Sequence, residues 1–346
     1  MQTEELVSLK RQSQENPLSR RAFVRALSIA TAAGPGVVAA GLSGMSLTSS
    51  QRAEAAEVII EGIGKLPTVK LGRLPFKVSP ISMSQDWNKE LFAPAIEIGV
   101  NFIHKAGYWG GNVPEEIKAL PRESYYTDIT VDTTSPGRDP DNYDQAIAQV
   151  KDSLSKNGLK YYDVYRAHYG WHSPEKVMKE ANTSFKAFEA LKKEGLVKYF
   201  GVSQHPYDGT DKEVIEKYAL LTQACIDSGI VDAMQVWYSF GYPKEVMEVF
   251  AKASKAGIGM TAMKINAHGR GKMTADVDRQ KALKAEGMIG RALLRDVMTE
   301  KRPDGKPIFH TCVSALRNMQ TFEENIGGVS PKIARVDGFD FNGHLA

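Results

Sequence analysis

The chain has 346 residues, of which 42% are hydrophobic and 25% are charged, and its formal net charge is +3. This composition is typical of a globular protein and excludes a largely disordered chain. The small net charge gives no indication of a nucleic-acid partner. The two cysteines, Cys225 and Cys312, stand far apart and form no Cys-x-x-Cys pair, which favours two buried thiols over a disulfide.

Residues 1–55 differ from the rest of the chain. A basic stretch at 19–25, Ser-Arg-Arg-Ala-Phe-Val-Arg, precedes a weakly apolar segment that contains no charged residue before Arg52 and ends in Ala-Glu-Ala at 53–55. This pattern predicts a cleaved twin-arginine signal peptide, which implies the twin-arginine export machinery as a partner and a periplasmic protein. The alternatives are a basic tail and a retained anchor. Five glycine and proline residues between 34 and 44 argue against a stable membrane span.

After a linker at 56–68, the apolar patterns predict strands and helices in strict alternation. Glycines stand where several of the helices should end, as Gly158 and Gly229 do. The expected strands are 78–83, 100–103, 125–131, 161–167, 197–202, 233–236, 258–263 and 309–313. The expected helices are 88–99, a short helix after Pro114, 140–157, a helix ending near 193, 211–228, 243–256, 284–299 and 319–326.

Eight strand–helix units in about 260 residues predict an α/β fold with parallel strands, the (β/α)8 TIM barrel. We expect this domain over residues 69–330, with a C-terminal tail at 331–346. An open, doubly wound sheet is the alternative. A Gly-x-Gly-x-x-Gly motif after the first strand is typical of that alternative, and this chain has none there.

Polar residues stand at the ends of these expected strands. Because active sites of such barrels lie at the carboxyl ends of the strands, these residues are expected to line one mouth. They are Ser84, His104, Asp132, His168, Ser203, Gln204, His205, Gln235, Lys264 and Ser314.

Several short segments at these places, in this order, resemble the aldo-keto reductase family over residues 69–328. They include Gly-Val-Asn-Phe at 99–102, Tyr-Asp-Val-Tyr at 162–165, Gly-Val-Ser at 201–203, Ala-Met-Lys at 262–264 and Glu-Glu-Asn at 323–325. The Ala-Met-Lys segment is most similar to bacterial members. The resemblance implies an oxidoreductase that holds NADP(H) at the barrel mouth and reduces a small carbonyl or oxidises an alcohol.

The resemblance also implies site residues. The histidine that orients the substrate falls on His168, and the tyrosine that donates the proton falls on Tyr108, or on Trp109 by strict spacing. Where the family has its aspartate and lysine, this chain has His104 and Asp132. The positions that hold the cofactor fall on Ser203, Gln204, Gln235, Lys264, Arg317, Glu324 and Asn325.

These changes alter the expected catalysis. A lysine cation lowers the pKa of the family's tyrosine, whereas a carboxylate at Asp132 would raise the pKa of Tyr108. We therefore expect carbonyl reduction to be slow or absent. His104 or His168 could move the proton instead.

A second hypothesis treats the protein as a metal-dependent enzyme or a non-catalytic binding protein. His104, Asp132 and His168 end successive strands, and two imidazoles with one carboxylate suit a divalent transition metal. The simpler alternative is a hydrogen-bonded His–Asp pair without a metal.

Overall fold

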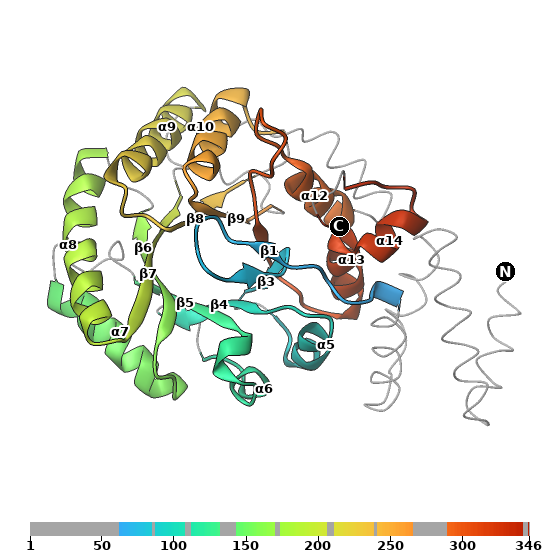
Figure 1. Cartoon of the computed structure of the whole chain (residues 1–346), viewed down its shortest axis with the longest axis horizontal. Coiled ribbons are helices and arrows are strands. Elements are labelled where there is room, and N and C mark those ends of the chain that lie inside the picture. The colour runs from blue at the N-terminus through green and yellow to red at the C-terminus, as the bar shows by residue number, and fades with distance from the viewer. Residues whose placement is uncertain are drawn as a thin grey trace, which may run out of the picture.

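The structure is a computed structural model that describes residues 62–84, 87–107, 112–131, 143–169, 174–205, 211–238, 241–265, 289–341 and 345. Eight parallel strands close into a barrel in the order β10-β3-β4-β5-β6-β7-β8-β9, which confirms the predicted (β/α)8 fold. Helices surround the strands (Figure 1). The barrel strands are β3 (Ile81–Met83), β4 (Phe102–Gly107), β5 (Tyr126–Val131), β6 (Tyr162–Tyr169), β7 (Val197–Gln204), β8 (Ala233–Trp237), β9 (Gly259–Met263) and β10 (Thr311–Ser314).

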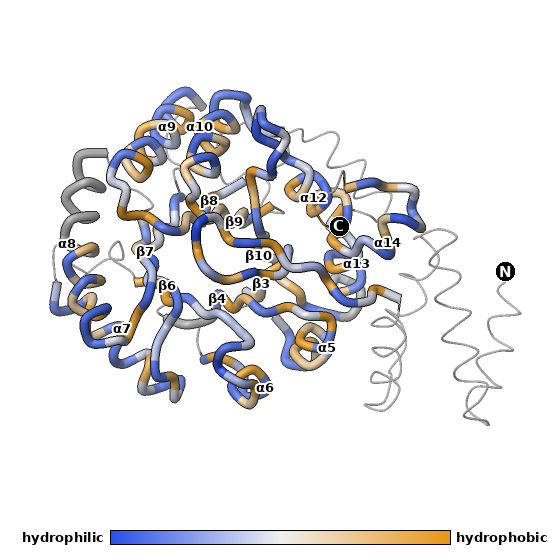
Figure 2. Tube along the Cα trace, viewed as in Figure 1, coloured by the Kyte–Doolittle hydropathy of each residue, from blue (hydrophilic) through white to orange (hydrophobic). Residues whose placement is uncertain are grey.

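The helices follow the predicted apolar stripes. In α10 (Lys244–Lys255) the buried residues Val246, Val249, Phe250 and Ala253 recur at helical spacing and face the barrel. Figure 2 shows hydrophobic and hydrophilic stretches alternating along α9 and α10. The other elements are η1 (Lys89–Leu91), α5 (Phe92–Glu97), α6 (Glu115–Lys118), η2 (Arg122–Ser124), α7 (Tyr143–Asn157), α8 (Pro174–Lys193), α9 (Asp211–Ser228), α12 (Ile289–Thr299), α13 (Met319–Val329) and α14 (Pro331–Val336).

Alternation along the strands decides which side chains enter the barrel. Successive side chains of a strand point to opposite faces. On β6, Val164 belongs to a small apolar cluster inside the barrel, whereas Tyr165 and Ala167 belong to the large cluster between strands and helices. Arg166 and His168 therefore face the interior, on the same side of β6 as Val164.

A hairpin that the sequence analysis missed closes the amino end of the barrel (Figure 1). Strands β1 (Val69–Lys70) and β2 (Lys77–Val78) pair antiparallel, so the predicted strand 78–83 is in fact the end of this hairpin followed by β3. Gly72 in the turn has a φ of +56°, and a Cβ there would lie 2.5 Å from the carbonyl oxygen of Gly257. The hairpin thus packs against the backbone that leads into β9, and the mouth at the opposite end is left for chemistry.

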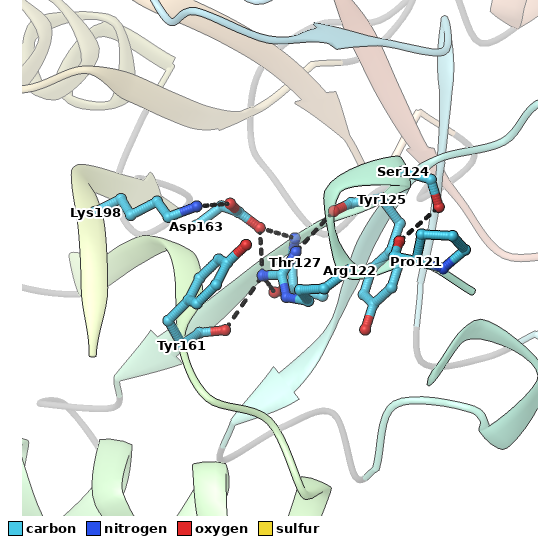
Figure 3. A network of polar contacts seen from close by, with 8 residues as sticks. All are labelled: Pro121, Arg122, Ser124, Tyr125, Thr127, Tyr161, Asp163 and Lys198. Carbon is cyan, nitrogen blue, oxygen red and sulfur yellow. Dashed lines mark hydrogen bonds and ion pairs between the residues drawn. The ribbon is translucent and has the colours of Figure 1, made fainter. Parts of the chain in front are cut away.

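A polar network holds the amino ends of β5, β6 and β7 together (Figure 3). Arg122 donates from Nη2 to the Asp163 carboxylate at 2.6 Å and from Nη1 to the carbonyl oxygen of Tyr125 at 2.8 Å. Asp163 also accepts from the backbone N–H of Thr127 at 3.0 Å and from Lys198 at 3.4 Å. One buried carboxylate therefore joins three strands.

The residues after 330 pack on the barrel. Helix α14 begins at Pro331, and Asp337 after it accepts from Arg291 of α12 at 3.0 Å. Phe341 is buried beyond it. The segment predicted as a tail thus contributes a helix and part of the apolar core. No helix in the described part of the chain is both long and apolar enough to span a membrane.

Two half-buried carboxyl groups, Asp296 and Glu300, make the stability of the fold depend on pH. Tyr238 donates its hydroxyl to Asp296 and, at 3.2 Å, lies against Glu300. Burial raises the pKa of Asp296 from its ordinary value of 3.8 to about 6, and Glu300 acts in the same direction. The pKa of Asp296 is higher in the folded than in the unfolded state. Its protonated form therefore contributes fully to the free energy of unfolding below about pH 4, and this contribution is lost as the pH rises through 6.

We therefore expect Asp296→Asn to remove part of the fall in stability between pH 4 and pH 7. Urea unfolding of both proteins across this range measures the effect. Curves that run parallel at every pH would contradict it.

Candidate functional site

Three polar side chains stand next to one another on the carboxyl-terminal halves of β6 and β7 and the middle of β8. His168 pairs in register with Ser203, and Ser203 pairs with Gln235. Residues in register on parallel strands point to the same face, so all three face the barrel interior. His168 and Ser203 are 6% and 3% exposed, which places them inside the mouth and away from bulk solvent.

His205 lies beside this row. Its ring is 4.6 Å from the ring of His168, and its Nε2 lies 3.2 Å from the Ser203 hydroxyl. Burial lowers the pKa of His205 well below its ordinary range, and the neighbouring basic side chains of His168, Lys264 and Arg166 lower it further. His205 is therefore neutral at pH 7 and can exchange a hydrogen bond with Ser203.

Lys264 follows β9 directly in an unusual backbone conformation. It is the one non-glycine residue with a positive φ, +58°, in the described part of the chain. Such conformations are strained by about 1 kcal/mol or more and concentrate at functional sites. Its ammonium group lies 5.4 Å from the centre of the Trp237 ring, at the end of β8.

A second polar group lies deeper in the barrel, between the mouth and the apolar floor. His104 of β4 contacts the Asp128 carboxylate of β5 through Nδ1, and Arg166 of β6 contacts the same oxygen through Nη2. Arg166 Nη2 is also 3.1 Å from His104 Nδ1. All three side chains are at most 5% exposed. The ring of Phe102, part of the floor, lies 4.2 Å from the ring of His104.

The charges of this group balance. Burial alone would raise the pKa of Asp128. The attraction of Arg166 and the hydrogen bond from His104 are together larger than this effect and hold the pKa of the carboxyl below its usual value. Burial lowers the pKa of His104, and Asp128 only partly opposes this. At pH 7 the group therefore contains one anion, one cation and one neutral imidazole.

Asp128 and Arg166 were not predicted as site residues, because they lie within β5 and β6 and not at the ends of these strands. A signal was present: Arg166 stands two residues before His168, so both share one strand face. Asp128 likewise interrupts an otherwise apolar and β-branched strand.

Gln204 does not lie where the sequence predicts. It is adjacent to Ser203, so its side chain points the opposite way, toward α9. There it accepts from Thr222 at 3.3 Å and lies 3.9 Å from the sulfur of Cys225. Its position outside the barrel mouth follows directly from the alternation of β7.

The other predicted cofactor residues lie around β10 and α13. Arg317 is exposed between these two elements. Glu324 accepts from the backbone N–H of Gly290 at 2.8 Å, at the start of α12. Asn325 donates to Ser314 at 3.0 Å. Arg317 is thus open to solvent, whereas Glu324 and Asn325 fasten α12 and β10 to α13.

Tyr108, Trp109 and Asp132 lie outside the described residues, and the predictions made for them stay predictions. Among the residues that the structure does describe, no three His, Cys, Asp or Glu side chains are arranged to hold a metal ion. The Arg166 guanidinium beside His104 would repel a cation there. The triad of His104, Asp132 and His168 therefore gains no support from His104.

The family model described as the aldo/keto reductase family matches residues 70–321. An uncharacterized oxidoreductase of Bacillus subtilis is 27% identical over 150 residues, 39% of this chain and 47% of that protein. An L-galactose dehydrogenase of Arabidopsis thaliana is 26% identical over 168 residues, 42% of this chain and 50% of that protein. The chain thus spans about half the length of these curated relatives.

Solved structures agree on the fold. A putative aldo-keto reductase of Pseudomonas aeruginosa superposes with a TM-score of 0.55 at 17% identity, over 78% of this chain and 98% of that chain. The holo form of an aldo-keto reductase of Bacillus halodurans gives a TM-score of 0.55 at 17% identity, over 78% of this chain and 96% of that chain.

Proposed function

This chain belongs to the aldo/keto reductase family, and from that premise we propose that it interconverts a small alcohol and its carbonyl with NADP(H). The observation that carries the proposal is the row of His168, Ser203 and Gln235 inside the mouth. It offers hydrogen-bonding groups on three neighbouring strands, in a place that excludes bulk water.

The residues present fit the nicotinamide end of such a cofactor. Ser203 and Gln235 present a hydroxyl and a carboxamide on one face, the groups that can bind a carboxamide. When bound, the cofactor supplies or accepts the hydride. Lys264 and Arg317 supply cations for its phosphates, near β9 and β10. Glu324 accepts from the backbone N–H of Gly290, and Asn325 donates to Ser314.

The roles of the chain's own residues follow from their placement. His168 faces the interior next to Ser203, where it can orient a substrate oxygen. The apolar floor around Phe102 and the hairpin close the other end, so substrate and cofactor must enter at the mouth.

We expect carbonyl reduction to be slow, because Asp132 stands where the family has its lysine. With glyceraldehyde and 4-nitrobenzaldehyde, NADPH oxidation should proceed below about 0.1 s⁻¹, under the usual range of about 1–10³ s⁻¹. L-galactose, named in the Arabidopsis relative, is the probe for oxidation with NADP⁺. Fast reduction of both aldehydes would refute the effect assigned to Asp132, and failure to bind either nucleotide would refute the function.

We also propose that residues 1–55 direct export through the twin-arginine machinery and that the barrel works in the periplasm. The support is the sequence pattern alone, since these residues lie outside the described part. This route carries folded proteins, so a bound nucleotide could travel with the barrel.

A further inference from the structure

The deeper polar group of the barrel holds a histidine in a defined tautomer. His104 Nδ1 lies within hydrogen-bond distance of both the Asp128 carboxylate and the Arg166 guanidinium. A carboxylate only accepts and a guanidinium only donates. If Nδ1 were unprotonated, two acceptors would face each other at very short range. A proton on Nδ1 makes that contact attractive, and Arg166 Nη2 then donates to Asp128. The contacts therefore assign the proton to Nδ1.

This tautomer leaves Nε2 of His104 as a hydrogen-bond acceptor. Nε2 is buried and has no hydrogen-bond partner among the described residues. Because Nδ1 faces Asp128 and Arg166, Nε2 lies on the ring edge turned away from them. A buried acceptor without a partner is unfavourable, because it has lost its hydrogen bonds to water. A group that donates a hydrogen bond would remove this cost.

An unprotonated His104 Nε2 can bind an alcohol but not a carbonyl. A hydroxyl can donate to Nε2, whereas a carbonyl oxygen would place two acceptors against each other. Resting on the proposed function, we propose that His104 is the general base of this site and that the site favours oxidation of an alcohol.

The proposed step balances. The carbinol C–H bond breaks and its electron pair leaves as hydride to the oxidised nicotinamide, while the O–H bond breaks and its proton passes to His104 Nε2. The carbonyl double bond forms between the same carbon and oxygen. The resulting imidazolium is stabilised by Asp128, which Arg166 holds in its ionised form. The proton then passes to water.

The electrostatics support this direction. Burial lowers the pKa of His104, so the ring is neutral at pH 7 and able to accept a proton. Oxidation should therefore lose rate only as the pH falls below the ordinary histidine value of 6.5.

The first test needs neither substrate nor cofactor. In ¹⁵N-histidine-labelled full chain, which has seven histidines, the His104 signals are those that disappear in His104→Asn. We expect Nδ1 protonated and Nε2 unprotonated at pH 7. Asp128→Asn should move the proton to Nε2, because Arg166 can then donate to Nδ1. A wild-type proton on Nε2 would overturn the proposal.

The second test measures oxidation of L-galactose with NADP⁺ as a function of pH. His104→Asn should lower kcat by about 10²- to 10⁴-fold and abolish the acidic limb of the profile. The control is His310→Asn, which changes a half-buried histidine whose Nδ1 accepts from the backbone N–H of Met260. Its kcat should stay within about threefold.

The outcomes separate the two proposals. If the wild type binds neither NADPH nor NADP⁺, the proposed function is wrong, and the proposed role of His104 as general base is wrong with it. If it binds NADP⁺ and oxidises the sugar, but His104→Asn retains most of kcat, only the role of His104 is overturned. Binding without any oxidation, together with measurable aldehyde reduction, would overturn the preferred direction.

Discussion

Asp128→Ala is expected to lower the free energy of unfolding by about 3–5 kcal/mol. The substitution leaves the Arg166 guanidinium, 5% exposed, buried in the barrel without its anion. It also removes the group that fixes His104. Urea unfolding of the full chain, monitored by circular dichroism, measures the loss.

Two controls isolate the buried charge in this experiment. Asp152→Ala removes a surface carboxylate paired with Lys156, both more than half exposed, and should change the stability by less than about 0.5 kcal/mol. The double variant Asp128→Leu/Arg166→Met removes both charges and should recover part of the loss, because no unpaired ion remains. A double variant less stable than Asp128→Ala would contradict this explanation.

Asp163→Ala should lower the free energy of unfolding by about 2–4 kcal/mol, the second large effect that we expect. The carboxylate is 4% exposed and accepts from Arg122 and from the backbone N–H of Thr127. Both donors would lose their partner at once, at the amino ends of three strands (Figure 3). The midpoint of urea unfolding reports the loss.

Asp163→Asn keeps one acceptor oxygen. It should therefore lower the free energy of unfolding by less than Asp163→Ala does, by about 1 kcal/mol. Lys198→Met removes a contact of a side chain that is 44% exposed and should change little. If Lys198→Met and Asp163→Ala were equally destabilising, the stability of this network would not depend on the pair of Arg122 and Asp163.

The sequence predicted the fold because local signals agreed with one another. Apolar runs gave all eight barrel strands to within a few residues, and Gly158 and Gly229 marked the ends of α7 and α9. The β1–β2 hairpin escaped prediction because strands of two residues are too short to show a period of two. Helix α14 was missed because it has only six residues.

The site was predicted less completely, for a different reason. His168, Ser203 and Gln235 were found because they lie in or at the ends of strands that could be recognised. Gln204 was placed in the mouth although its neighbour Ser203 already faces it, and adjacent strand residues cannot both do so. The partnership of Asp128 with Arg166 joins two strands and depends on how the closed barrel brings them together, which no local pattern encodes.

The central claim is that the row of His168, Ser203 and Gln235 receives the nicotinamide end of NADP(H). The most direct measurement is equilibrium binding of NADPH to the full chain, followed by its fluorescence. We predict that Gln235→Leu weakens binding by about tenfold, the value of one hydrogen bond to a buried carboxamide. Gln204→Leu, whose side chain lies against α9, should leave it unchanged. Absence of binding by the wild type, or a loss in Gln204→Leu without one in Gln235→Leu, would contradict the account.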